Sequence, residues 1–227
     1  MRTKNAVLLT LVLALVLGMA VVASGATIPA LRASPTAVAY PHSARLMSTV
    51  TTPSVVVRRL AGASEWTTFA VVVSGDATTT VKKPTSSAAY KVISDGVESD
   101  PVTITVAAQL SKPQVNSRGN KGHKLTIKGW VAPVHAGGTV QLTFFRWDKV
   151  GSTVVTTGKG KSRTIAKYQW VQHDGRVDVS LARQNSQRSK WSYKWTPSAK
   201  GTWKIVVSHE DVAHVYSSAS ARTVINR

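Results

Sequence analysis

The chain has 227 residues, of which 43% are hydrophobic and 17% charged, with 29 Lys and Arg against 10 Asp and Glu. This balance is typical of folded globular proteins and excludes the disordered and collagen-like classes. The sequence contains no cysteine, which excludes disulfides, thiol chemistry and a lipid anchor on a thiol.

The first 26 residues have the three parts of an export signal. Arg2 and Lys4 supply positive charge, residues 6–22 are almost continuously apolar, and residues 24–26 are small. This order predicts a signal helix that is cleaved after Ala26. An uncleaved membrane anchor is the alternative, because the apolar run is near the lower limit of a bilayer span. In both cases we expect the rest of the chain to be extracellular or on the cell surface.

Two structured units follow, and a polar stretch with Pro113, Gly119 and Asn120 separates them. Residues 27–111 carry seven Lys and Arg against five Asp and Glu, a net charge of +2, whereas residues 112–227 carry twenty against five, a net charge of +15. We expect a signal peptide (1–26), a linker (27–35), a first domain (36–108), a second linker (109–120) and a second domain (121–227) with a basic insertion at about 151–189.

Alternation of apolar and polar residues in the first unit predicts short β-strands. Asp95 and Gly96 form a two-residue hairpin signal between two of them. The apolar positions that we expect to share one core are Val55, Val57, Tyr90, Val92, Val102, Ile104 and Val106.

The second unit shows the same period of two. Turn residues at Gly137–Gly138 and at residues 199–201 separate its predicted strands. Several short strands with turns between them favour an all-β sandwich. The expected core positions are Leu125, Ile127, Val140, Leu142, Phe144, Trp191, Tyr193, Trp195, Trp203, Ile205 and Val207.

Several windows resemble the immunoglobulin-like repeats of secreted and surface proteins in actinobacteria and related Gram-positive bacteria. In the second unit these windows are residues 125–130, 133–138, 198–204 and 211–214, and in the first unit they are 84–90 and 94–97. The resemblance runs from about Thr36 to the C-terminus and implies two tandem immunoglobulin-like antiparallel β-sandwiches. It also implies a role as a spacer, adhesive or wall-associated module. The insertion departs from such a repeat.

Clustered cations in the second unit are the main candidate for a binding surface, since they attract polyanions in a salt-dependent way. The predicted polyanion-binding residues are Lys159, Lys161, Arg163, Lys167, Arg183, Arg188, Lys190 and Lys194. Trp130, Trp147 and Trp170 fall outside the expected core and are candidates for contact with sugar rings. The alternatives are a generally basic surface without a dedicated partner, and ordinary packing of the aromatic rings.

The sequence contains no complete catalytic motif that we recognise. The His209 to His214 segment has its histidines five residues apart, whereas a zinc-protease helix needs four, and the scattered acidic residues do not suggest a glycosidase. We therefore predict no catalytic residues, no metal and no cofactor. A loose metal site using His135, His209, Asp211 or His214 is the alternative.

The sequence thus predicts a non-enzymatic, exported cell-surface or cell-wall protein that acts in binding, adhesion or spacing. Its expected partner is an anionic cell-wall polymer or polysaccharide, with non-specific binding of extracellular nucleic acid and self-association as further partners, and no dedicated small-molecule substrate. The alternatives are a structural subunit of a surface layer or filament, and an unrecognised hydrolase in the insertion.

Overall fold

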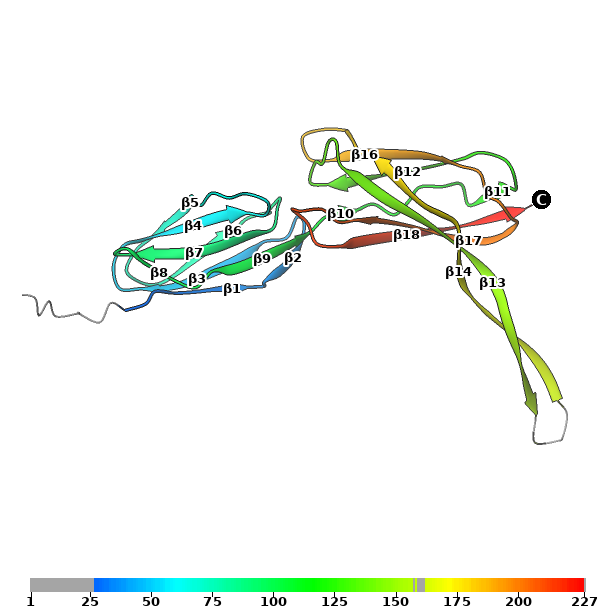
Figure 1. Ribbon diagram of the computed structural model, residues 1–227, viewed down its shortest axis with the longest axis horizontal. Coiled ribbons are helices and arrows are strands. Elements are labelled where there is room, and N and C mark those ends of the chain that lie inside the picture. Colours follow the sequence, from blue (N-terminus) through cyan, green and yellow to red (C-terminus); the bar gives the residue numbers. More distant parts are fainter. Residues whose placement is uncertain (1–26, 157, 159–161, 227) are drawn as a thin grey trace, which may run out of the picture.

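The computed structural model describes residues 27–156, 158 and 162–226, so the predicted signal helix lies outside the described residues. Within them the chain forms eighteen strands and no helix, which confirms the predicted all-β class (Figure 1). Correspondingly, no helix in the described part of the chain is long and apolar enough to cross a membrane.

The first domain is a sandwich of two sheets. One sheet has the order β1-β3-β6, and the other has the order β2-β9-β7-β4-β5 with β8 paired to β7. Neighbouring strands are antiparallel, except that β2 runs parallel to β9 at the sheet edge. The strands are β1 (Ala30–Ser34), β2 (Ala37–Ala39), β3 (Ala44–Val50), β4 (Ser54–Leu60), β5 (Thr67–Val72), β6 (Gly75–Val81), β7 (Ala88–Ser94), β8 (Val97–Glu98) and β9 (Val102–Ala107).

The second domain is also a sandwich. Its four-stranded sheet has the order β10-β12-β16-β15, and its five-stranded sheet has the order β11-β18-β17-β13-β14, in which β11 runs parallel to β18. The strands are β10 (Gln109–Leu110), β11 (Arg118–Asn120), β12 (Leu125–Ala132), β13 (Thr139–Thr156), β14 (Ser162–Ser180), β15 (Ala182–Arg183), β16 (Ser189–Trp195), β17 (Gly201–His209) and β18 (Ser217–Asn226).

Both stretches predicted as linkers contain strands. β1 begins at Ala30 and pairs with β3, so residues 30–34 belong to the first sandwich. β10 and β11 pair with β12 and β18, so much of 109–120 belongs to the second sandwich. The predicted linker boundaries are therefore wrong. Short edge strands rich in Ala, Arg and Gly show little apolar alternation, so the sequence pattern did not indicate them.

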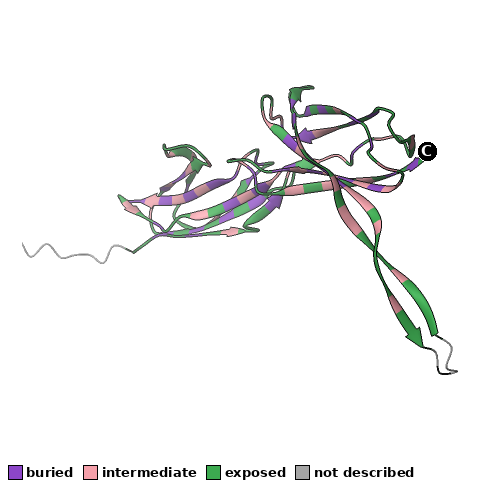
Figure 2. Cartoon of the chain, turned by 45° about the vertical axis from the view of Figure 1, so that its right-hand side comes forward, coloured by how far each residue is buried: buried purple, intermediate pink, exposed green. Residues whose placement is uncertain are grey.

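The sequence had indicated that the basic insertion breaks the strand pattern, and this prediction is wrong for the residues that the structure describes. The described residues of the insertion form most of an antiparallel hairpin of β13 and β14, which continues beyond the sandwich as a projecting arm, defined as residues 147–156 and 162–170 (Figure 1). Figure 2 shows that the arm is mostly exposed, whereas buried residues concentrate inside the two sandwiches. The two strands of a long hairpin satisfy each other's backbone hydrogen bonds without packing on a core. Its sequence therefore does not need the alternation of apolar and polar residues that marks other strands.

Each sandwich has its own hydrophobic core, and the two clusters share no residue. Most predicted core positions are buried in them, among them Tyr90, Ile104, Phe144 and Trp203. Val55 is a correction, because a β-bulge between Val56 and Val57 turns both of these residues inward and leaves Val55 only half-buried. Tyr193 and Val102 are partly buried and pack against the cores from their edges.

The predicted hairpin at Asp95 and Gly96 is confirmed. Ser94 pairs with Val97, and the two turn residues have φ angles of 48° and 80°. Positive φ at both central positions defines the turn whose twist matches that of the flanking strands, and Asp-Gly is a favoured sequence for it.

The loop between β17 and β18 of the second domain contacts the first domain. The backbone N–H of Ser87 donates to the carbonyl of Ala213 at 2.7 Å, and the N–H of Val215 donates to the carbonyl of Val106 at 2.9 Å. Ala107 and Val215 form an isolated parallel β-bridge. Residues 210–216 of the second domain therefore lie against the edge of the first, and this contact is called the domain junction below.

Candidate functional site

The outer face of the four-stranded sheet gathers several of the predicted cations. In the β12–β16 pair, Lys128 lies opposite Ser192, Trp130 opposite Lys190, and Thr126 opposite Lys194. Residues opposite each other share a face, and the intervening Leu125, Ile127, Trp191 and Trp195 point inward to the core. The exposed residues form a surface, called the cationic sheet face, that consists of Lys128, Trp130, Arg188, Lys190 and Lys194.

A groove runs along this surface, with a volume of about 580 Å³. Lys128 and Lys190 line it together with Trp130, Gln114 and Gln184. None of the residues in the four described strands of this sheet is acidic. The groove therefore offers ammonium groups and amide donors to a ligand, without a carboxylate in the sheet to repel an anion.

Trp130 contributes to the cationic sheet face differently from the prediction. The guanidinium carbon of Arg188 lies 4.1 Å from the centroid of its ring. This cation–π contact covers one face of the indole and holds the Arg188 charge beside the groove. Trp130 therefore orients a cation and does not present both faces to a sugar ring.

The other predicted cations lie elsewhere. Arg163 and Lys167 are exposed on the arm, whereas Lys159 and Lys161 lie outside the described residues. Arg183 pairs with Ser189, whose side chain is buried, so Arg183 leaves the sheet edge on the side opposite Lys190. The six predicted cations that the structure describes thus do not form one surface. Lys128, which was not among the predicted cations, belongs to the cationic sheet face because of the register between β12 and β16.

An aromatic patch lies at the base of the arm. Trp147 and Trp170 are directly opposite in the β13–β14 pair, with ring centroids 5.2 Å apart, and Tyr168 stacks on Trp147 at 6.2 Å. Lys204 and Arg222 place their charges 5.1 and 5.3 Å from the Trp170 ring. Trp147 is 44% exposed and Tyr168 49%, so both rings are open to solvent. This arm-base patch confirms that Trp147 and Trp170 lie outside the core.

Asp148 fastens the arm to the five-stranded sheet. It accepts hydrogen bonds from Arg146 Nε at 2.5 Å and Nη2 at 3.1 Å, and its Oδ2 lies 2.5 Å from His173 Nε2. The hydrogen bond from Arg146 is the main cause that lowers the pKa of Asp148 below its ordinary value of 3.8. His173 in turn packs edge-on against the buried Trp203.

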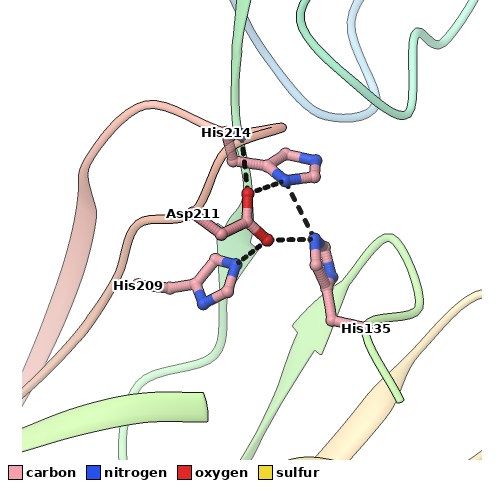
Figure 3. Close-up of side chains that lie close together, drawn as sticks. All are labelled: His135, His209, Asp211 and His214. Carbon is pink, nitrogen blue, oxygen red and sulfur yellow. Dashed lines mark hydrogen bonds and ion pairs between the residues drawn. The ribbon is translucent and has the colours of Figure 1, made fainter. Parts of the chain in front are cut away.

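A second site forms at the domain junction, where three histidines and one aspartate converge (Figure 3). His135 comes from the β12–β13 loop, His209 ends β17, and Asp211 and His214 lie in the loop that contacts the first domain. Their potential ligand atoms all lie within 4.8 Å of one another. In the sequence these four residues suggest only a loose alternative site, because His135 lies 74 or more positions from the other three and meets them only through loop packing.

Burial differs among the four residues. The side chains of His209 and His214 are almost inaccessible, at 1% and 2%, whereas that of Asp211 is 33% exposed. Burial, followed by the charge of His214, lowers the pKa of His135. Burial alone would raise the pKa of Asp211, but the hydrogen bond and charge of His214 outweigh burial. The pKa of Asp211 therefore lies below its ordinary value.

The strand orders of the sheets define the chain as a protein of two immunoglobulin-like β-sandwiches. No family model and no curated protein matches the sequence. Among solved structures, the chain is similar to native E. coli alpha-2-macroglobulin, with 8% identity and a TM-score of 0.38 over 87% of this chain and 16% of that one. The chain therefore spans a small part of that protein.

Two further structures are similar over most of this chain. The ligand-binding domain of human OSCAR has 15% identity and a TM-score of 0.25, over 87% of this chain and 97% of that one. Red sea bream transglutaminase has 12% identity and a TM-score of 0.34, over 88% of this chain and 32% of that one. With TM-scores below 0.5, these likenesses carry no inference about what this chain does.

Proposed function

We propose that the chain is an exported bacterial surface protein without enzymatic activity, which binds an anionic cell-wall polymer or polysaccharide through its second domain. The observation that carries the proposal is the cationic sheet face, where Lys128 and Lys190 line a groove of about 580 Å³ in a sheet whose described strands hold no acidic residue. Arg188, which lies over the Trp130 ring, and Lys194 add two more cations to the same face. The export signal and the charge difference between the two halves of the chain support it.

Binding of this kind depends on several weak contacts acting together. One pair of unit charges 4 Å apart contributes only about 1 kcal/mol in water, and at 0.15 M salt the field of an exposed charge extends over about 8 Å. A repeating anionic polymer can engage Lys128, Lys190 and Lys194 at once, which a single small anion cannot. Binding through several separate cations therefore favours a polymer over a small-molecule substrate.

The arm-base patch supplies a second kind of contact. Trp147 and Tyr168 present exposed aromatic surface suited to sugar rings. The charges of Lys204 and Arg222 lie over the neighbouring Trp170 ring, where they can receive acidic substituents. This combination favours a polymer that contains sugars over one made only of phosphate.

The test compares two triple variants that remove the same charge. Lys128→Gln/Lys190→Gln/Lys194→Gln removes the three lysines of the cationic sheet face, and Arg32→Gln/Arg45→Gln/Lys82→Gln removes three exposed cations of the first domain. Co-sedimentation with purified bacterial cell walls is measured from 50 to 500 mM NaCl. We expect the first variant to lose about tenfold or more in affinity at low salt and to show a shallower salt dependence, whereas the control retains its binding. Equal loss in both variants would contradict the assigned surface.

A second candidate function, self-assembly into a surface layer or filament, rests on the arm. Val154 is 63% exposed and Ile165 47%, and such residues on a projecting hairpin can pair with another copy. Sedimentation velocity of the unchanged chain and of Val154→Lys/Ile165→Lys tests it. Concentration-dependent association that the variant abolishes would support assembly, and a monomer at all concentrations would contradict it.

A further inference from the structure

The hydrogen bonds around the junction histidines define which ring nitrogen of each carries the proton. His135 Nδ1 lies 2.5 Å from the carbonyl of Pro133, His209 Nδ1 lies 2.8 Å from the carbonyl of Thr139, and His214 Nε2 lies 2.9 Å from the carbonyl of Thr85. A carbonyl oxygen only accepts hydrogen bonds, so each of these nitrogens donates. In a neutral imidazole the opposite nitrogen then carries a lone pair.

All three lone pairs face the same point. His135 Nε2 and His214 Nδ1 lie 2.9 Å apart, and His209 Nε2 lies 3.3 Å from Oδ2 of Asp211. His209 Nε2 is buried and makes no hydrogen bond to any residue that the structure describes. With all three imidazoles neutral, three nitrogen acceptors and a carboxylate thus converge, an arrangement that repels itself unless a metal ion or an added proton lies among them.

We propose that His135 Nε2, His209 Nε2, His214 Nδ1 and a carboxylate oxygen of Asp211 bind one divalent transition-metal ion of the zinc class. Imidazole nitrogen and carboxylate oxygen are ligands that Zn²⁺ takes in four-coordinate sites, at about 2.0–2.2 Å. A tetrahedron with such bonds places its ligand atoms about 3.3 Å apart. Four of the separations in the cluster, two of them to Oδ2 and one to Oδ1 of Asp211, run from 2.9 to 3.6 Å, and all four ligand atoms lie within 4.8 Å of one another. Side-chain shifts without a change of backbone therefore suffice to bring them to this distance.

The groups behind the ligands fit the same function. Metal-binding histidines commonly donate their second N–H to a backbone carbonyl, as all three do here. Asp211 is oriented in a comparable way, since its Oδ1 accepts the backbone N–H groups of Ala213 at 2.8 Å and His214 at 2.7 Å. Its Oδ2 remains directed at His135 and His209.

The position of the site defines its role. Four protein ligands fill a tetrahedral ion and leave no place for a substrate or a reacting water, so the ion is structural. His214 also bonds the first domain through Thr85, and a crevice of about 360 Å³ lined by Tyr40, Thr85, His135 and His214 gives access to the cluster. A bound ion would therefore hold the loop of residues 210–216 in the conformation that joins the two domains.

The experiment uses the purified chain without a polyhistidine tag, freed of metal by a chelator. Isothermal titration with Zn²⁺ is expected to show one ion per chain, and Co²⁺ is expected to give the intense visible bands of a tetrahedral site. His209→Ala and Asp211→Asn should each weaken Zn²⁺ binding by about 100-fold or more, because second-shell changes alone cost 10–100-fold. His42→Ala/His123→Ala, which removes two exposed histidines outside the cluster, is the matched control and should bind as the unchanged chain does.

Further readouts separate a metal site from a structural cluster. Zn²⁺ should raise the unfolding midpoint of the unchanged chain and of the control, and leave that of His209→Ala unaltered. A chain that binds no Zn²⁺ and gives a Co²⁺ spectrum of octahedral type would overturn the proposal. So would binding that survives in His209→Ala but is lost in His42→Ala/His123→Ala. The Co²⁺ spectrum of the unchanged chain decides the question even if a variant misfolds.

Discussion

Nε2 of His214 lies 2.9 Å from the carbonyl oxygen of Thr85, a residue 129 positions earlier in the chain and in the other domain. The same imidazole directs its Nδ1 at Asp211 and His135 in the second domain. One buried side chain therefore belongs to the junction cluster and to the contact between the domains. Binding at the cluster and the arrangement of the two sandwiches are coupled through it.

Replacing His214 by Ala should weaken the domain junction. The change removes a buried hydrogen bond and leaves its partners unsatisfied, which costs about 1–3 kcal/mol. We expect faster proteolysis in the 210–216 loop and a broader distribution of domain separations in small-angle X-ray scattering. His123→Ala, at an exposed position outside the cluster, is the control. Unchanged scattering and proteolysis in His214→Ala would show that the backbone bonds of Ser87 and Val215 alone hold the junction.

Trp203→Ala should unfold the second domain selectively. Trp203 is fully buried, and truncation of such a side chain costs about 3–5 kcal/mol. Because the two cores share no residue, we expect the urea midpoint of the second domain to fall while that of the first changes little. Tyr90→Ala in the first core is the reciprocal control. A single transition that shifts equally in both variants would mean that the domains unfold together.

Asp148 makes stability depend on acid pH. Its folded pKa lies below the ordinary value of 3.8, chiefly because Arg146 donates to it, so the ionised form is favoured in the folded state. Its contribution is present above that value and is lost as pH falls through the folded pKa. We expect Asp148→Asn to lower the free energy of unfolding at pH 7 and to flatten its decline below pH 4, as measured by urea denaturation. Asp178→Asn, an exposed site, is the control.

Gly96→Ala tests the turn between β7 and β8. Gly96 has a φ of 80°, which L-residues with a side chain adopt at a cost of about 1–2 kcal/mol. We expect the variant to lose about that much stability. Gly151→Ala on the arm is the control, because Gly151 does not have a positive φ and a Cβ added there meets no atom within 4 Å. Equal effects of the two substitutions would contradict the importance of the backbone angle.

Trp147→Ala/Tyr168→Ala separates stacking from charge in polymer binding. The change removes the exposed rings of the arm-base patch and alters no charge. We expect binding to an acidic polysaccharide to weaken by about 1–3 kcal/mol while its salt dependence keeps the slope of the unchanged chain. Binding to polyphosphate, which has no sugar rings, should remain. A change of slope would mean that the aromatic rings act by positioning Lys204 and Arg222.

Local alternation in the sequence determined the β class, most of both cores and the Asp95–Gly96 turn, because side chains in a strand face opposite sides with a period of two. The count of charged residues identified the second domain as the basic one. The Val55 position shows the limit of this pattern, since a single bulged residue reverses the facing of the strand. The arm lay beyond the pattern because an exposed hairpin needs no apolar face.

The sites depended on pairing between distant strands. Lys128 and Lys190 meet only because β12 pairs with β16, and Trp147 meets Trp170 through the register of the arm. His135 joins His209, Asp211 and His214 from 74 or more positions away, because the β12–β13 loop packs against the end of β17 and the loop that follows it. Composition and local spacing determine which residues are present and which way each strand faces, but the contacts between segments far apart in the chain arise only when the sheets assemble. The tertiary structure alone therefore decided which cations share a surface and which histidines share a centre.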